Sequence, residues 1–328
     1  MMIKNFLSTT VFILYLFPSV IMAAEPSGKM QLDVSVSEWL SISDSWWGIS
    51  GNVSSVLPNH SWGSRLDFNN SDSNITVIGG KLRFDKRLAI KASYGAGDIN
   101  KGSVRDRDWI TVPGLNDYNR LVSESIEDGG GDTSIFEIGA DILLTGLDSS
   151  SNIYLYLGYF FYEDYINITN GIQTVSDNTY FDASDTYWSN WGFNPVGSSY
   201  PALSSTYKFS WEFLKLGVNV QFEKERFAFE AGGNYLYLSS YKGDGFWNLR
   251  PLNFVHESDN GYGFDGSLKV SYRVYGSAWL SLGYRYFKLK AEDGLDTTYF
   301  SDGSVATALF DDAESERKGP VLYFDWSF

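Results

Sequence analysis

The sequence predicts an all-β protein, a transmembrane antiparallel β-barrel of about ten strands, and three observations predict it. Apolar and polar residues alternate with a period of two in many segments, as in strands whose two faces meet different surroundings. Aromatic residues make up 17% of the chain and there are 32 glycines, a composition that suits a barrel with interfacial aromatic girdles. The last segment keeps this alternation up to a terminal phenylalanine. We therefore expect strands that cross lipid.

The first 24 residues have the organisation of a secretory signal peptide. Lys4 precedes an almost uncharged apolar stretch, and the small residues Ala23 and Ala24 end it before Glu25. The stretch is shorter than the ~20 residues of a membrane-spanning helix, which disfavours the alternative of an uncleaved anchor. We expect cleavage near Ala24, export to the bacterial outer membrane, and one barrel domain over residues 25–328.

Composition excludes some classes of partner. The formal net charge of -15 disfavours nucleic acid, because its phosphates would be repelled. The chain has no cysteine, so its stability has to come from the closed sheet rather than from disulfides. Acidic outer loops would suit metal ions or cationic peptides, and a solvated acidic surface is the simpler alternative.

The clearest alternation lies between residues 214 and 222. Leu214 and Leu216 share one face of the predicted strand, and Lys215 and Asn219 share the other. We predict that the apolar positions of such strands face lipid and that the polar positions fill the lumen. Comparable patterns, which include Leu268 and Leu282, occur in residues 32–37, 78–85, 136–144, 264–274 and 280–286.

Charged residues of both signs occupy the predicted lumen positions. A ten-stranded barrel is narrow enough for side chains to fill its interior. Opposite charges confined there should pair, because an unpaired buried charge is costly. We predict a plugged lumen, which disfavours a small-solute channel. The residues concerned are Asp33, Lys81, Arg83, Glu137, Asp141, Lys215, Glu230, Asp265, Lys269, Arg273 and Arg285.

The C-terminal segment supplies a further signal. Leu322, Phe324, Trp326 and Phe328 alternate with Tyr323, Asp325 and Ser327. A final strand that ends in phenylalanine resembles the signal that barrel-assembly machinery reads, so this machinery is an expected partner through Phe328.

Short and long connections alternate along the sequence. Tight turns are expected at 85–87, 147–152, 223–226 and 275–278. Long polar stretches, expected as extracellular loops, cover about 51–63, 106–133, 170–205, 240–258 and 290–315. Four turns and five loops give ten strands, with both termini on the short-turn side, which is the periplasmic side in such barrels.

The densest titratable cluster near an expected strand end is Val104-Arg105-Asp106-Arg107-Asp108-Trp109. Asp106 and Asp108 are two residues apart, so both side chains point to one face of a strand. Two neighbouring carboxylates can share a proton or hold a water molecule. The alternative is that each pairs with Arg105, with Arg107 or with solvent.

At this point the chain resembles the omptins, ten-stranded outer-membrane proteases. Ser64-Arg65-Leu66-Asp67-Phe68, a long strand, a tight turn, a returning strand and then Asp106-x-Asp108-Trp109 follow in the family's order. The strands predicted at 137–144, 207–220, 227–237 and 262–274 fall in register with it. The resemblance covers nearly the whole mature chain.

The resemblance implies a site in a cleft at the outer rim. Asp106 and Asp108 match the aspartate pair of one wall, and Asp244 matches the aspartate of the opposite wall. Phe246 then stands where the family has the histidine that accepts a proton, so activity is lost or altered. The chain has two histidines, His60 and His256; each is an alternative base, and ordinary loop histidines are the simpler interpretation.

The resemblance therefore implies an omptin-like surface barrel whose site residues are Asp106, Asp108 and Asp244. It also implies basic peptide substrates and bound lipopolysaccharide, with no other cofactor and no metal. The alternative is a non-enzymatic adhesin, receptor or structural barrel. The segment 170–205, with Trp188 and Trp191, suits recognition of a host surface ligand.

Overall fold

The computed structural model describes residues 30–52, 61–84, 87–111, 120–146, 150–178 and 193–328. The predicted signal peptide lies outside these residues. In the described residues there is no helix that is both long and apolar enough to span a membrane. The strands are β1 (Gln31–Asn52), β2 (Ser61–Arg83), β3 (Leu88–Thr111), β4 (Arg120–Gly146), β5 (Ser151–Ser176), β6 (Ser199–Lys224), β7 (Phe227–Trp247), β8 (Leu252–Ser258), β9 (Asn260–Tyr275), β10 (Ala278–Phe300) and β11 (Val305–Ser327).

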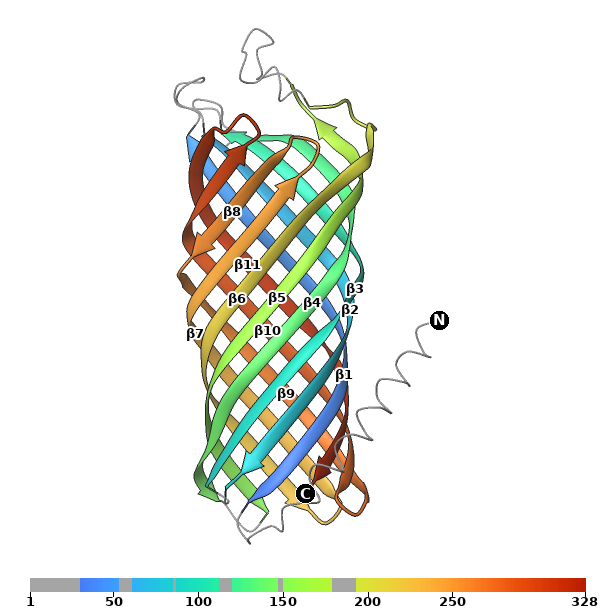
Figure 1. Ribbon diagram of the computed structural model, residues 1–328, viewed down its shortest axis with the longest axis vertical. Coiled ribbons are helices and arrows are strands. Elements are labelled where there is room, and N and C mark those ends of the chain that lie inside the picture. Colours follow the sequence, from blue (N-terminus) through green and yellow to red (C-terminus); the bar gives the residue numbers. More distant parts are fainter. Residues whose placement is uncertain (1–29, 53–60, 85–86, 112–119, 147–149, 179–192) are drawn as a thin grey trace.

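The strands close into a single antiparallel ring (Figure 1). β1 pairs with β2 on one side and with β11 on the other, which joins the two ends of the sheet. β8 and β9 are separated only by Asp259, and both lie between β7 and β10. The eleven segments therefore make a ten-stranded barrel, as predicted, because β8 and β9 together occupy one strand position. We call each of these ten strand positions a stave. Closure gives every strand two neighbours, so no sheet edge is left for lipid to cover.

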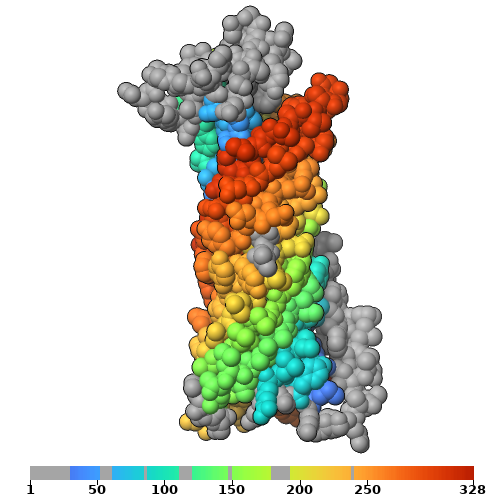
Figure 2. All heavy atoms as spheres, turned by 90° about the vertical axis from the view of Figure 1, so that its left-hand side faces the viewer, coloured from blue at the N-terminus to red at the C-terminus, as the bar shows by residue number. Residues whose placement is uncertain are grey.

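The barrel is much taller than a bilayer is thick. Apart from β8 and β9, the strands are 21 to 27 residues long. At about 3.3 Å per residue and a tilt of about 40°, ~24 residues rise about 60 Å, roughly twice the 25–30 Å of hydrocarbon. Figure 2, turned by 90°, shows the same tall and narrow outline. About half of the barrel therefore projects beyond the lipid.

The outer face of β6 marks where lipid ends. Near the short turns its outward side chains are apolar, and Leu214 and Leu216 are 40% and 42% exposed. From Glu212 upward the outward positions become polar, with Lys208 bound to Glu163 of β5 at 3.0 Å. Leu268 and Leu282, 53% and 63% exposed, belong to the same apolar band. The predicted lipid-facing positions are thus confirmed for the half of the barrel that carries the short turns.

The inner face of β6 changes in the opposite sense. Lys215 is the buried, inward residue at the level of the lipid band. Farther up the same strand, Phe213, Trp211, Phe209 and Tyr207 point inward and are buried. The expectation of a polar lumen is therefore wrong for this part of β6: in the outer half, apolar side chains occupy much of the interior, beside buried polar groups such as Asp164 and Arg317.

The lumen is closed by ion pairs and aromatic rings. Lys215 binds Glu137 and Asp265, and Arg285 contacts the same two carboxylates at 3.1 and 3.3 Å. Above this cluster, Arg317 reaches Asp164 at 2.9 Å. The predicted pairing of inward charges is thus confirmed for this cluster. A continuous buried core, which includes Trp39, Phe160, Trp211, Phe213 and Phe287, fills the space around and above it.

Most of the predicted loops are strands instead. Residues 106–111 complete β3 and residues 120–133 begin β4, while 240–247 and 252–258 belong to β7 and β8. Between β10 and β11 only residues 301–304 remain. The polar outward residues of the projecting half resemble loop sequence, although the period of two continues through them. Trp188 and Trp191 lie outside the described residues.

We predict that the intact protein, reconstituted in a planar bilayer, shows no steady conductance. The Lys215–Asp265 cluster and the aromatic core leave ions no hydrated path through the lumen. A sixteen-stranded porin in the same bilayer is the positive control. Large and stable current steps from the purified protein would contradict the closed lumen.

Candidate functional site

A cavity of about 250 Å³ lies at the end of the barrel opposite the short turns. Its charged lining consists of Asp106 and Asp108 from β3, Asp296 from β10, and Arg250 from the turn between β7 and β8. The remaining walls are mainly aromatic and aliphatic and include Trp47, Trp62, Trp109, Trp247 and Phe254. The cavity therefore places carboxylates among apolar surfaces at the outer rim.

The period of two in β3 positions the aspartate pair. Asp106 and Asp108 share the inward face, as predicted, and both line the cavity. Arg105 and Arg107 point to the other face, where Arg105 lies 3.8 Å from Glu124. Arg107 binds Asp67 of β2 on that face. The alternative that these arginines neutralise Asp106 and Asp108 is therefore wrong.

Burial perturbs both carboxyl groups of the pair. Desolvation, followed by the charges of Asp108 and Glu127, raises the pKa of Asp106 well above its usual range, while Arg250 acts against it. Desolvation also raises the pKa of Asp108, against Arg250 and a hydrogen bond from Ser64. The apolar walls thus favour a proton on Asp106, because its ionised form lacks full compensation.

A further carboxyl group lies next to the pair on the neighbouring strand. Glu127 of β4 is 3% exposed, and burial raises its pKa to about 7. The Ser125 hydroxyl donates to Glu127 Oε1, while Oε2 has no hydrogen-bond partner in the described part of the chain. Ser125 also faces Asp106 across the β3–β4 ladder. Glu127 therefore titrates near neutral pH. It lies on the same face of β4 as Ser125, two residues farther from the cavity.

Asp296 is linked to a buried chain of hydrogen-bonding groups. His256 Nε2 lies 3.0 Å from Asp296 Oδ1, and His256 Nδ1 lies 2.9 Å from the Tyr207 hydroxyl. The Tyr207 hydroxyl in turn lies 2.7 Å from that of Tyr241. Burial lowers the pKa of His256, although Asp296 acts in the opposite direction. A neutral ring that accepts a hydrogen bond from Tyr207 at Nδ1 carries its proton on Nε2, which lies close to Asp296 Oδ1 but outside hydrogen-bond alignment.

Two glycines of β7 make room for this chain. A Cβ on Gly243 would lie 2.1 Å from the Tyr207 hydroxyl oxygen, and a Cβ on Gly245 would lie 2.0 Å from the ring of Phe254. Both glycines face inward, which places the residues between them on the outside of the barrel.

Asp244 and Phe246 are those outward residues, and the structure does not bring them to the cavity. The Asp244 side chain is 49% exposed and lies 3.8 Å from Lys242, and Phe246 is 39% exposed. The placement of Asp244 opposite the Asp106 pair is therefore wrong, because the inward positions of β7 belong to Gly243 and Gly245. His60 lies outside the described residues. His256 is a buried partner of Asp296 rather than a loop histidine.

The arrangement limits what chemistry the site can perform. Both nitrogens of His256 face protein groups, so neither is directed at a water molecule in the cavity. The ionisable groups that line the cavity are three carboxyl groups and one guanidinium. They can hold a cation, or exchange protons with a bound molecule. Among the described residues, no group of three or more His, Asp or Glu side chains is arranged to hold a metal ion.

Sequence reasoning missed Asp296, Arg250 and the role of His256. Phe254, His256 and Ser258 alternate on one face of β8, a pattern that marks them as inward residues. Asp296 faces His256 directly across the β8–β10 ladder, but the two are 40 residues apart. Their pairing required the register between strands, which the sequence alone does not supply.

The closed ring of ten antiparallel staves, apolar outside at lipid height and charged inside, defines an outer-membrane β-barrel protein. A family model described as Pom, Protochlamydia outer membrane protein, matches residues 45–318. The chain belongs to this family and is a protein of the outer membrane.

Among solved structures, the chain is similar to the outer membrane protease OmpT from Escherichia coli. The TM-score is 0.75 at 12% identity, and the match covers 93% of this chain and 99% of that one. The outer membrane protein OprG from Pseudomonas aeruginosa matches at 8% identity over 92% of this chain and 96% of its own, with a TM-score of 0.28. No curated protein matches the chain by sequence. At this identity the likeness to OmpT shows a common fold.

We predict that Glu127→Gln changes how stability depends on pH. Between pH 4.5 and about 7 the native Glu127 stays protonated while the unfolded one ionises, so the native protein loses stability as the pH rises. The loss amounts to about 3 kcal/mol above pH 7, and Glu127→Gln should remove it. The measurement is the free energy of unfolding in detergent from pH 4.5 to 8.

Asp128→Asn is the matched control, because Asp128 is adjacent in sequence but lies on the exposed face of β4. It should keep the wild-type slope. An unchanged slope in Glu127→Gln would show that Glu127 ionises normally.

Proposed function

We propose that this outer-membrane barrel is an omptin-like surface protein that binds basic peptide segments in its outer cavity. The observation that carries the proposal is the excess of carboxyl groups over basic groups in the lining of the cavity. Asp106, Asp108 and Asp296 line it, against the single guanidinium of Arg250. A lysine or arginine side chain from outside would supply the positive charge that this set of carboxyl groups accommodates.

The walls of the cavity support the same ligand class. Trp62, Trp109 and Trp247 line the cavity together with the carboxyl groups. Lysine and arginine carry a long aliphatic stem and a cationic head, so aromatic surface stabilises the stem while carboxylates bind the head. A small anion would meet three carboxyl groups, and a purely apolar ligand would leave them desolvated and unpaired.

Peptide hydrolysis is the second candidate, and the raised pKa of Asp106 favours it. A carboxyl group that keeps its proton beside one that ionises more readily is the arrangement with which two aspartates activate water and protonate a leaving group. In this proposal Asp106 supplies the proton, and Asp108 or Asp296 accepts one from water. The buried ring of His256 packs against Asp296, with Nε2 3.0 Å from Oδ1. Phe246 has no part in it, because it faces outward.

We predict that a basic peptide binds the folded protein and that Asp106→Asn/Asp108→Asn weakens binding at least tenfold. The measurement is fluorescence anisotropy of a labelled oligoarginine peptide with protein in detergent. Cation binding requires ionised carboxylates, whose pKa values are raised, so affinity should fall as the pH is lowered.

Asp244→Asn removes a carboxylate from the exposed face of β7 and is the control that should bind normally. Equal affinities of the wild type and the double variant would contradict the cavity as the binding site.

Hydrolysis is tested by incubating the same peptide with protein in lipid vesicles and measuring fragments by mass spectrometry. If the carboxyl groups act as proposed, the rate of cleavage falls at least a hundredfold in Asp106→Asn and in one of the two variants Asp108→Asn and Asp296→Asn, which identifies the group that accepts the proton from water. Phe246→His should leave the rate unchanged. A rate gained in Phe246→His, or cleavage that survives in Asp106→Asn or in both of the other aspartate variants, would contradict this assignment.

A further inference from the structure

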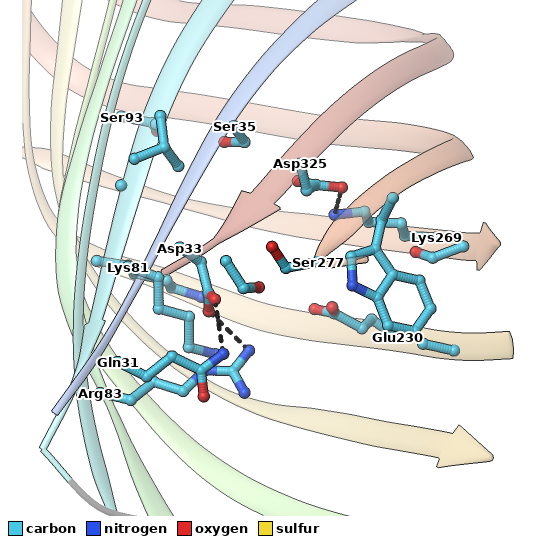
Figure 3. Close-up of a pocket in the computed structure, with 18 of the residues that line it drawn as sticks. Gln31, Asp33, Ser35, Lys81, Arg83, Ser93, Glu230, Lys269, Ser277 and Asp325 are labelled. Atoms are coloured by element: carbon cyan, nitrogen blue, oxygen red, sulfur yellow. Dashed lines mark hydrogen bonds and ion pairs between the residues drawn. The ribbon is translucent and has the colours of Figure 1, made fainter. Parts of the chain in front are cut away.

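A second and larger cavity, of about 480 Å³, lies inside the barrel at its short-turn end. Its volume is in the range of cavities that hold small molecules. The Lys215–Asp265 cluster, which includes Glu137, closes this cavity toward the middle of the barrel. The cavity therefore opens away from the aspartate site. Figure 3 shows its lining, in which Lys81 and Arg83 lie on one side and Glu230 and Lys269 on the other.

Most charges of this cavity are paired within their own wall. Arg83 lies 2.9 Å from Asp33, and Lys269 lies 2.8 Å from Asp325. Arg273 binds Glu223 at 2.6 Å near the turns. Because these charges pair, the cavity as a whole has no large surplus of one sign and does not select a simple anion or cation.

One wall has a surplus of positive charge. Lys81 and Lys91 both bind Asp141, at 2.8 and 3.4 Å, so two ammonium groups share one carboxylate. Asp141 Oδ1, the atom nearest Lys91, also accepts a hydrogen bond from Asn219. Lys91 lies over the ring of Tyr156 at 4.0 Å and keeps 30% of its side chain exposed. Glu137 also attracts the Lys91 ammonium group but is shared with Lys215 and Arg285, so the charge of Lys91 is incompletely neutralised where it lines the cavity.

The opposite wall has a surplus of negative charge. Glu230 of β7 faces Lys269 across the β7–β9 ladder, but the Lys269 ammonium turns to Asp325. Glu230 lines the cavity and shares the charge of the Lys269 ammonium group with Asp325, so two carboxylates face one ammonium group on this wall. In the ring of ten staves, β7 lies four positions from β3 and five from β2, so Glu230 is across the lumen from the lysines.

We propose that this cavity is a binding site for a small zwitterion, a short peptide with free amino and carboxyl ends. The ligand carboxylate binds Lys91, and the ligand ammonium binds Glu230. Each contact supplies the charge that its wall lacks, and the neutral ligand keeps the cavity neutral. The site is independent of the outer cavity and of the function proposed for it.

The test uses the dipeptide alanyl-alanine as the probe and the full-length folded protein in detergent. Binding is measured by isothermal titration calorimetry. We expect saturable binding that weakens at least tenfold when the amino end is acetylated, and at least tenfold when the carboxyl end is amidated. Absence of saturation up to about 10 mM, or a capped peptide that binds as tightly as the uncapped dipeptide, would overturn the proposal.

Two variants assign the ends of the ligand. In Glu230→Gln the acetyl cap should no longer matter while the amide cap still does, and Lys91→Met should show the reverse. Glu163→Gln, on the outer face of β5, should bind as the wild type does. If each cap weakens binding by the same factor in the wild type and in both variants, the assignment of the ligand ends is wrong. If a variant fails to fold, binding of the capped peptides to the wild type alone tests the proposal.

Discussion

One sheet in this protein meets two solvents, and the rest of the structure follows from that constraint. Side chains alternate strictly between the two faces of a strand, so a strand that passes from lipid into water has to change the composition of its outer stripe. In β6 the change falls between Leu214 and Glu212. The inner stripe changes in the opposite sense, from Lys215 to Phe213. The projecting half is thus organised like a water-soluble barrel, with its apolar core inside.

This inversion separates the interior into compartments. At lipid height the lumen is polar, and its charges pair around Glu137 and Asp265. Above it the aromatic core isolates the two ends from each other. The aspartate cavity lies beyond that core, where water reaches its mouth but apolar walls surround Asp106 and Asp108. Those walls raise the pKa values of the aspartates and give the site its chemical character.

The sequence was sufficient for the features that depend on one strand at a time. The lipid-facing leucines and the common face of Asp106 and Asp108 follow from the period of two, and the ten strand positions follow from the alternation of short and long connections. The expected position of Asp244 is wrong because the resemblance gives its place along the strand but not the face on which it lies. Gly243 and Gly245 occupy the inward positions, which places Asp244 on the outer face. The contact of His256 with Asp296 depends on the register between β8 and β10, and the projecting strands were read as loops because their outer stripe is polar.

Site-directed spin labelling along β6 tests the inversion most directly. The chain has no cysteine, so Leu216→Cys, Glu212→Cys and Lys208→Cys each provide a single outward attachment site. In bilayers, we expect a label at 216 to collide mainly with oxygen dissolved in lipid, and labels at 212 and 208 to collide mainly with a water-soluble nickel complex. A lipid-like label at position 208, or a water-like label at position 216, would contradict the inversion.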